Sequence, residues 1–214
     1  MLWTAAVLFA AVVAFGIWLR AAGADPLPVD RWWHDLAGVA PDSPAFGLAR
    51  ALAVAGSGIG AASCTAAAVL ALLGFRRIRD AGAVATAMLL GILASENLKL
   101  LVARPRPWDA LLDPPGFSYP SGHSMGAAAL AVSLALIAAA APASPSAPVR
   151  PARRRVAWAI AAAWILLMMW SRTAVQVHWL SDTIAGAALG IAAALTARAL
   201  WLRLRAPREP AAAP

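Results

Sequence analysis

Residues 122–141, GHSMGAAALAVSLALIAAAA, form a nearly unbroken apolar run that begins beside a histidine. A helical run of about 20 residues spans the roughly 30 Å hydrocarbon core of a bilayer. Further apolar runs cover residues 2–19, 51–75, 81–102, 156–170 and 182–201. Because the runs are continuous and do not alternate with polar residues, they predict helices and not the strands of a membrane barrel. The sequence therefore predicts an all-α membrane bundle of six transmembrane helices.

The composition of the 214-residue chain excludes a soluble globular domain. Hydrophobic residues make up 62% of the chain and charged residues 13%, against about 45–50% and about 25% in an ordinary soluble domain. An apolar content this high also excludes intrinsic disorder. The single cysteine, Cys64, leaves no internal disulfide to form.

Arginine clusters set the expected orientation. They follow the second, fourth and sixth runs, at residues 76–79, 150–155 and 203–208, so a six-helix path places all three on one side. Cytoplasmic loops are enriched in Lys and Arg, and we expect this side, with both termini, to be cytoplasmic. The net charge of +8 is then an orientation signal, not a nucleic-acid-binding surface.

The expected organisation is a single domain over residues 1–205 with a short cytoplasmic tail at 206–214. Residues 142–151, rich in Pro, Ala and Ser, read as a linker. No Lys or Arg precedes the first run, and its length favours a retained helix over a cleaved signal peptide. Between the first and second runs, apolar residues recur at helical spacing over residues 29–39. This segment is either a helix lying in the outer membrane interface or an aromatic belt segment.

Polar residues collect at one level of this topology, opposite the arginine clusters. They are Glu96, Lys99, Arg104, Arg106, Ser121, His123, Ser171, Arg172, His178 and Asp182. Charges at membrane depth are costly and mark functional sites by default. Lys99 is the only lysine among 18 basic residues. It either binds a ligand at this rim or pairs with Glu96 three positions earlier.

These residue types predict a pocket for an anion. Guanidinium groups bind phosphate oxygens bidentately, and Ser121-Gly122-His123 at a helix start adds free backbone N–H groups. No carboxylate or cysteine cluster accompanies them, so we expect neither a metal nor a cofactor. His178 and Asp182, four residues apart on a helix, would share a face, which lets the carboxylate orient a nucleophilic imidazole. His123 is free to act as a general acid.

Three ordered motifs resemble the signature of the type 2 phosphatidic acid phosphatase superfamily, which also contains the vanadium haloperoxidases. The first is Lys99, six residues, then Arg106-Pro107. The second is Pro120-Ser121-Gly122-His123, and the third is Ser171-Arg172, five residues, His178, three residues, Asp182. All three spacings match without departure.

The resemblance implies a role for each matched residue. His178 would attack phosphorus to give a phosphohistidine, with Asp182 orienting it, and His123 would protonate the departing oxygen. The phosphoryl oxygens would be held by Lys99, Arg106, Arg172, Ser121 and the Gly122 amide. The spacing from Lys99 selects Arg106, so Arg104 is interpreted as a headgroup or pocket-rim residue. Glu96 and Tyr119 receive no family role, and packing or pairing with Lys99 is the default.

The leading hypothesis is a metal-independent phosphatase that hydrolyses a lipid phosphate or diphosphate at the outer, periplasmic leaflet of a bacterial plasma membrane. Candidate substrates are phosphatidate, phosphatidylglycerol phosphate and polyprenyl diphosphates such as undecaprenyl diphosphate, the last slightly favoured by the lack of a large outer domain. Six apolar spans argue against a haloperoxidase. A non-catalytic lipid-binding protein would have a damaged triad, whereas His123, His178 and Asp182 are all present. The expected partners are membrane lipids, and the oligomeric state is left open.

Overall fold

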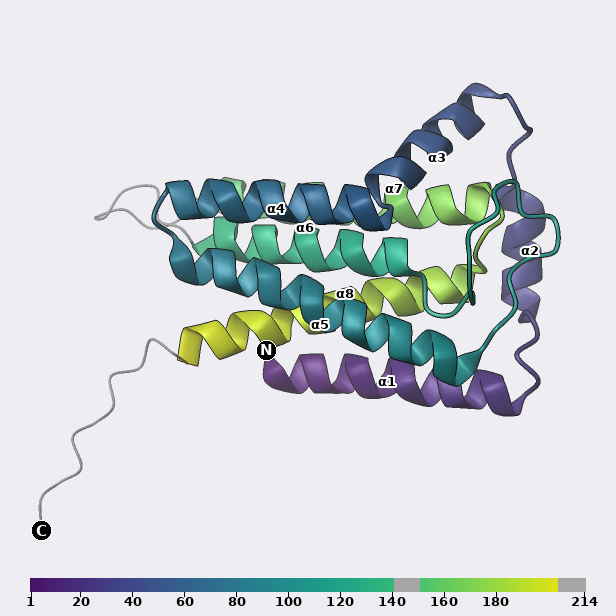
Figure 1. Cartoon of the computed structure of the whole chain (residues 1–214), viewed down its shortest axis with the longest axis horizontal. Coiled ribbons are helices and arrows are strands. Elements are labelled where there is room, and N and C mark those ends of the chain that lie inside the picture. Colours follow the sequence, from purple (N-terminus) through teal and green to yellow (C-terminus); the bar gives the residue numbers. More distant parts are fainter. Residues whose placement is uncertain (141–150, 204–214) are drawn as a thin grey trace, which may run out of the picture.

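The computed structural model describes residues 1–140 and 151–203. Within these ranges the regular elements are all helices (Figure 1). They are α1 (Leu2–Ala21), α2 (Pro28–Ala37), α3 (Pro44–Ala55), α4 (Gly58–Gly74), α5 (Ile78–Val102), α6 (Gly122–Ala140), α7 (Pro151–Ala174) and α8 (Leu180–Arg203). Five of them, α1, α5, α6, α7 and α8, are long and apolar enough to cross a membrane. The predicted all-α membrane bundle is confirmed.

The expected continuous helix over residues 51–75 is wrong. The chain bends by 62° between α3 and α4, which count as a sixth span only when taken together. Gly56 ends α3, and the Ser57 hydroxyl caps α4 by accepting the Gly60 N–H at 3.1 Å. Serine at an N-cap satisfies one of the free N–H groups of a new helix, so this Gly-Ser pair favours two helices over one.

α8 lies inside the bundle and packs against α1, α5 and α6. Its contact with α6 depends on Gly186, because a Cβ at this position would overlap the Ser121 carbonyl oxygen. The close approach also places the Ser121 N–H 3.0 Å from the Asp182 carbonyl oxygen. The second and third sequence motifs therefore meet where α6 and α8 begin.

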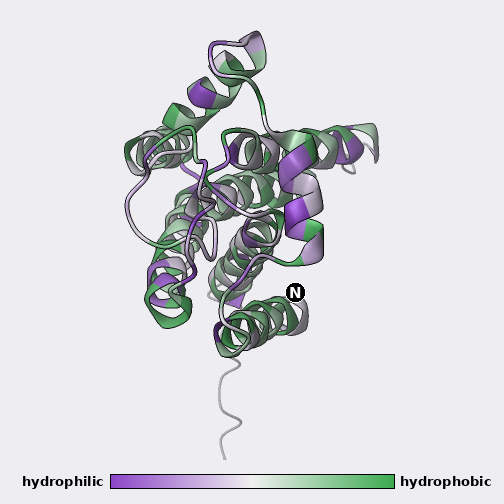
Figure 2. Ribbon diagram, turned by 90° about the vertical axis from the view of Figure 1, so that its right-hand side faces the viewer, coloured by the Kyte–Doolittle hydropathy of each residue, from purple (hydrophilic) through white to green (hydrophobic). Residues whose placement is uncertain are grey.

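α2 crosses one end of the bundle (Figures 1 and 2). Asp30 and His34 are buried against the bundle, whereas Val29, Trp32 and Leu36 are exposed. Of the two alternatives for residues 29–39, a helix or an aromatic belt segment, the structure contains the helix, over Pro28–Ala37. Its position in a membrane interface stays a prediction. The arginine-bearing turn between α4 and α5 lies at the opposite end (Figure 1).

The predicted helix over residues 156–170 is longer at both ends in the structure, because α7 begins at Pro151 and continues to Ala174. Its last turn includes Ser171 and Arg172, so this helix delivers part of the third motif. The predicted linker at 142–151, apart from Pro151, and the predicted tail at 206–214 lie outside the described residues.

Candidate active site

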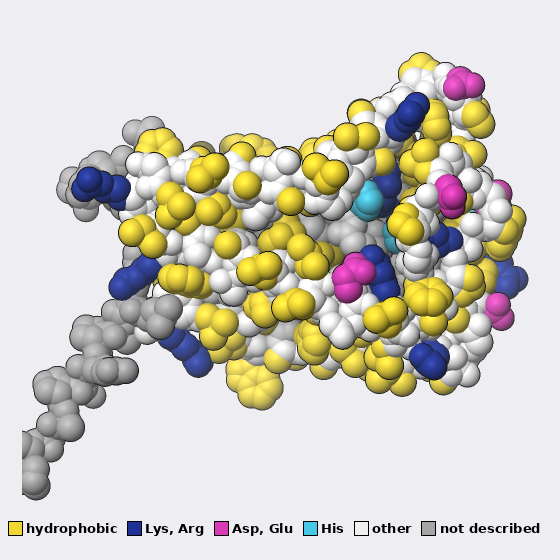
Figure 3. Space-filling view, viewed as in Figure 1, with side chains coloured by type: hydrophobic (Ala, Val, Ile, Leu, Met, Phe, Trp, Pro, Cys, Tyr) yellow, Lys and Arg dark blue, Asp and Glu magenta, His cyan; other side chains and the backbone are white. Residues whose placement is uncertain are grey.

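A cavity of about 370 Å³ opens at the end of the bundle near α2. It lies among α4, α5, α6, the end of α7 and the segments that precede α4, α6 and α8. Figure 3 shows histidine and basic side chains gathered around a hollow at this end, while the sides of the long helices are largely hydrophobic. Six of the eight predicted site residues line the cavity: Lys99, Arg106, Gly122, His123, Arg172 and His178. Segments separated by up to 79 positions thus converge on one pocket.

His178 lies in the loop between α7 and α8, two residues before α8 begins. The expectation that His178 and Asp182 share a helix face is therefore wrong. The turn that opens α8 brings them together instead, with the Asp182 N–H donating to the Trp179 carbonyl oxygen at 3.1 Å. The Nδ1 atom of His178 lies 3.7 Å from Oδ2 of Asp182 and 3.4 Å from the Ser118 hydroxyl.

The contacts of His178 define its tautomer. Arg106 directs an N–H toward Nε2 at 3.2 Å, and a guanidinium can only donate. Nε2 therefore carries the lone pair, and Nδ1 carries the proton that faces Ser118 and Asp182. The Arg106 side chain is itself held by the carbonyl oxygens of Pro115, Gly116 and Val177 at 2.8–3.1 Å.

The surroundings keep the His178 imidazole neutral. Burial lowers its pKa to about 4, and the Arg106 and Arg172 cations act in the same direction, against the hydrogen bond to Asp182. Burial also lowers the pKa of the Arg106 guanidinium from its usual value. An uncharged imidazole with a lone pair at Nε2 is the form that acts as a nucleophile, once the Arg106 N–H leaves that lone pair.

His123, in the first turn of α6, is fixed by the break between α3 and α4. Its Nε2 lies 3.1 Å from the carbonyl oxygen of Ala53, which accepts a hydrogen bond, so Nε2 carries a proton in this state. The last carbonyls of a helix lack intrahelical partners, and α3 ends two residues later, at Ala55. Gly56 leaves room for the ring, since a Cβ there would lie 2.9 Å from Cδ2 of His123.

Two further cations border the cavity. Lys99 Nζ lies 2.7 Å from a carboxylate oxygen of Glu96, so Lys99 both lines the pocket and makes the ion pair expected as its default. Arg172 is 2% exposed and donates to the Ala49 carbonyl oxygen at 3.2 Å and to the Ser171 hydroxyl at 3.3 Å. A positive surface that excludes most solvent favours binding of a phosphate group.

The remaining two predicted residues lie behind the cavity wall. Asp182 is fully buried, and its Oδ2 accepts the Trp179 N–H at 2.9 Å and the Ser118 hydroxyl. Ser121 is also buried, and its hydroxyl lies 3.3 Å from that of Ser124. Phosphate binding by the Ser121 hydroxyl stays a prediction.

Arg104 is not the rim residue that its sequence position predicted. Its side chain is fully buried and lies 2.6 Å from Asp182 and 2.8 Å from Asp30 of α2. The sequence also did not predict that Ser118 contacts His178 and Asp182, or that Asp30 pairs with Arg104. Asp30 and His34, four residues apart and buried together on α2, carried a signal, since polar residues on the inward face of an amphipathic helix need partners.

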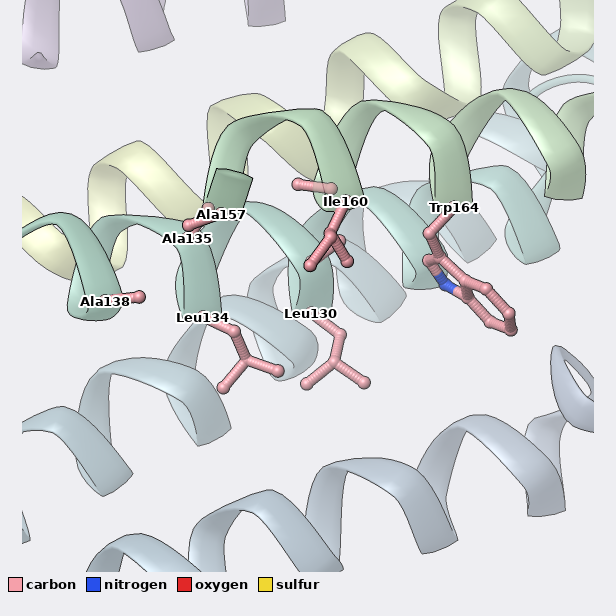
Figure 4. A pocket seen from close by; sticks show the side chains of 9 residues that line it. Leu130, Leu134, Ala135, Ala138, Ala157, Ile160 and Trp164 are labelled. Carbon is pink, nitrogen blue, oxygen red and sulfur yellow. The ribbon is translucent and has the colours of Figure 1, made fainter. Parts of the chain in front are cut away.

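Two other hollows within the described residues lack this chemistry. A groove of about 610 Å³ among α1, α5 and α8 has no charged lining residue. Another of about 330 Å³ lies between α6 and α7, where Figure 4 shows Leu130, Leu134, Ile160 and Trp164 beside one apolar space. Within residues 1–140 and 151–203, no three His, Cys, Asp or Glu side chains are grouped to hold a metal ion.

The sequence model of the PAP2 superfamily matches residues 80–206, more than half of the chain and the whole span of the three motifs. The chain belongs to the PAP2 superfamily. Comparison with curated proteins gives no match. The family match confirms the resemblance inferred from the three motifs between Lys99 and Asp182.

Two solved PAP2-like structures share the fold. The transmembrane PAP2-type phosphatidylglycerolphosphate phosphatase of Bacillus subtilis aligns with a TM-score of 0.75 at 20% identity, covering 92% of this chain and 97% of that one. LpxE of Aquifex aeolicus aligns with a TM-score of 0.59 at 22% identity, covering 77% and 91%. This PAP2 chain thus shares the fold of a transmembrane protein over most of its length, and its long apolar helices mark it as an integral membrane protein.

Proposed function

We propose that this PAP2 protein is a metal-independent phosphatase that hydrolyses a lipid phosphate or diphosphate through a phosphohistidine. The proposal depends above all on one observation. Nε2 of His178, whose lone pair accepts an N–H from Arg106, lies at a cavity that also contains the cationic side chains of Lys99, Arg106 and Arg172. A phosphoryl group that binds these cations draws the Arg106 N–H away and leaves Nε2 free to attack.

In the first step, Nε2 of His178 attacks phosphorus, and the bond from phosphorus to the leaving oxygen breaks. The proton on Nδ1 stays directed at Ser118 and Asp182, which stabilise the cationic ring that forms. His123, doubly protonated at this point, transfers a proton to the leaving oxygen and becomes neutral. The three cations and the Gly122 N–H neutralise charge on the equatorial oxygens, the main task in phosphoryl transfer.

In the second step, water attacks the phosphohistidine on phosphorus. His123 takes up the water proton as the nitrogen–phosphorus bond breaks, releasing inorganic phosphate and restoring the lone pair on Nε2. Protonated His123 is then ready for the next turnover. The cationic side chains supply the charge that a metal ion provides in other phosphoryl-transfer sites, which supports a metal-independent reaction.

The shape of the cavity supports an amphiphilic substrate. Below Lys99 and His123 its lining becomes apolar, with Ala61 and Ala62 of α4 facing Met88 and Ile92 of α5. Met88 and Lys99 are eleven residues apart on α5, a rise of about 16 Å. A lipid can therefore place its phosphate among the cations while its acyl or prenyl chain extends between α4 and α5.

The position of the arginine-rich turns supports an outer-leaflet, periplasmic site. Arg77 pairs with Asp80 at 2.7 Å, and Arg198 of α8 pairs with the same carboxylate. This end of the bundle lies opposite the end that α2 crosses (Figure 1), near which the cavity opens. The end of a membrane protein that is rich in Lys and Arg favours the cytoplasm. A cysteine at position 109, in a Cys64→Ser background, should react with an impermeant maleimide added outside intact cells; labelling only after lysis would reverse the orientation.

The test of the reaction uses purified protein in detergent with EDTA present. We expect phosphate release from at least one of phosphatidate, phosphatidylglycerol phosphate and undecaprenyl diphosphate, ranked by kcat/KM. Quenching turnover on a ³²P-labelled substrate with alkaline SDS should trap a phosphoprotein that is stable in base and labile in acid. His123→Ala should accumulate this species if breakdown needs His123 more than formation does.

His178→Ala should abolish both turnover and the phosphoprotein. His34→Ala is the matched control, since the third histidine lies on α2 outside the cavity. A His178→Ala enzyme with near-normal turnover, or activity that requires added Mg²⁺, would refute the proposal.

A further inference from the structure

A buried ion network lies directly behind the proposed catalytic dyad. The Arg104 guanidinium bridges Asp182 of α8 at 2.6 Å and Asp30 of α2 at 2.8 Å, and all three side chains are fully buried. Buried ion pairs are costly unless every donor and acceptor is satisfied. A network kept at this cost, next to a reacting group, needs an explanation beyond packing.

Arg104 uses its whole donor set. Nε donates to the Ala24 carbonyl oxygen and one terminal nitrogen to the Asp25 carbonyl oxygen, at 3.3 and 3.1 Å. The other terminal nitrogen donates to the Ser181 hydroxyl at 2.8 Å as well as to Asp182. With Asp30, these contacts account for all five N–H groups of a guanidinium. The plane of Arg104 is therefore fixed from three directions.

Asp30 also holds the start of α8. Its Oδ1 accepts the Ser181 N–H at 2.8 Å, and its Oδ2 accepts the Ser181 hydroxyl at 2.8 Å. Carboxylates at a helix N-terminus are stabilised by the free N–H groups and the helix dipole. Asp30 thus fixes the turn that carries Asp182 as well as the guanidinium beside it.

The geometry points to Arg104 and Asp30 as positioning residues for the phosphatase reaction. We infer that Arg104 holds Oδ1 of Asp182 so that Oδ2 faces His178, while Asp30 balances the arginine charge and leaves Asp182 anionic toward the imidazole. This inference rests on the proposed function. Neither residue lines the cavity, so both act through Asp182 and not on the substrate.

The positioning role predicts that removing Arg104 and removing the Asp30 charge have opposite effects on the protonation of His178. The groups that face His178 are Asp182, Arg106 and Ser118 in direct contact, with the cations Arg172 and Lys99 and the ring of His123 around the same cavity. Removing Arg104 leaves Asp182 less neutralised and favours a protonated imidazole, whereas removing the Asp30 charge does the opposite. A purely structural role would move both variants in one direction.

The experiment compares Arg104→Gln, Asp30→Asn and the double variant for kcat, KM and the pH dependence of kcat/KM. We expect kcat to fall about 10- to 100-fold in each single variant, as for other supporting partners of reactive groups, with KM changed little. The acidic limb should move to higher pH in Arg104→Gln and to the same or lower pH in Asp30→Asn. The double variant should lose less than the product of the two single effects.

Asp109→Asn is the matched control, because it removes a charge that also holds α2 in place, through the 3.0 Å pair between Asp109 and His34. This pair makes no contact with Asp182. Equal losses in Asp109→Asn and Asp30→Asn, or limbs that move together in the two single variants, would overturn the inference. If Arg104→Gln does not fold, the kcat of Asp30→Asn still tests the inference. This variant keeps the size and one acceptor oxygen of the side chain.

A second readout separates this inference from the proposed function. The chain contains three histidines, so ¹⁵N-histidine NMR in micelles, assigned with His178→Ala, follows the titration of His178 without a substrate. We expect His178 to titrate at higher pH in Arg104→Gln than in wild type. If the wild type lacks phosphatase activity but this shift appears, the proposed function fails and the positioning inference stands. If the wild type is active but the shift is absent, the positioning inference fails and the proposed function stands.

Discussion

Replacing Glu96 by glutamine removes the carboxylate that pairs with Lys99 in the substrate-free cavity. A phosphate that binds Lys99 must displace this carboxylate, which lies 2.7 Å from Nζ. The amide keeps nearly the same size and carries no charge. Glu96→Gln should therefore strengthen phosphate binding without altering the groups that react.

The size of the effect follows from the exposure of the pair. The Glu96 side chain is 61% exposed and that of Lys99 is 19% exposed, so water screens most of the attraction. Exposed ion pairs contribute about 0.2–1 kcal/mol, and about 1.4 kcal/mol corresponds to a tenfold change in affinity. The expected tightening is therefore about 1.4- to 5-fold, with kcat unchanged.

The assay measures the inhibition constant of orthophosphate together with KM, because KM equals a dissociation constant only when chemistry is slow. The gain should shrink as salt rises, since ions screen the carboxylate. Asp35→Asn is the matched control because it removes the same charge from an exposed position on α2. Phosphate binding that weakens in Glu96→Gln, or that tightens equally in Asp35→Asn, contradicts the competition.

Three other predictions test the site. Because burial lowers the pKa of His178 to about 4 and the neutral ring attacks, the limb of kcat/KM due to the nucleophile should lie near pH 4; a limb near 6.5 would contradict a buried neutral ring. Gly186→Ala should lower the Tm and the activity, because its Cβ overlaps the Ser121 carbonyl, whereas Gly47→Ala, with open space around it, should do neither. Vanadate should inhibit competitively, and Arg172→Gln should raise its inhibition constant; inhibition unaffected by substrate would argue against a shared phosphate pocket.

The sequence predicts the helices well because hydropathy is a local property. The predicted run at 122–141 begins where α6 begins and ends one residue after it. The predicted run at 81–102 ends where α5 ends and begins three residues after its start. The run at 51–75 fails because Gly56 and Ser57 are too few to lower its average hydropathy, yet they supply a helix end and a cap. The break matters for the site, since it frees the Ala53 carbonyl for His123.

By itself the sequence determined that the protein crosses a membrane and that it carries the three motifs of its family, because residue type and spacing are written along the chain. It also predicted that these motifs, between Lys99 and Asp182, form one phosphate-binding site. The tertiary structure decided which nitrogen of His178 carries the lone pair, since that depends on the N–H that Arg106 directs toward Nε2. It also decided that Arg104 is buried, because its partners lie 74 to 80 residues away along the chain. Spacing reports neighbours on one element, whereas the charge around a buried group is set by elements that meet only when the chain folds.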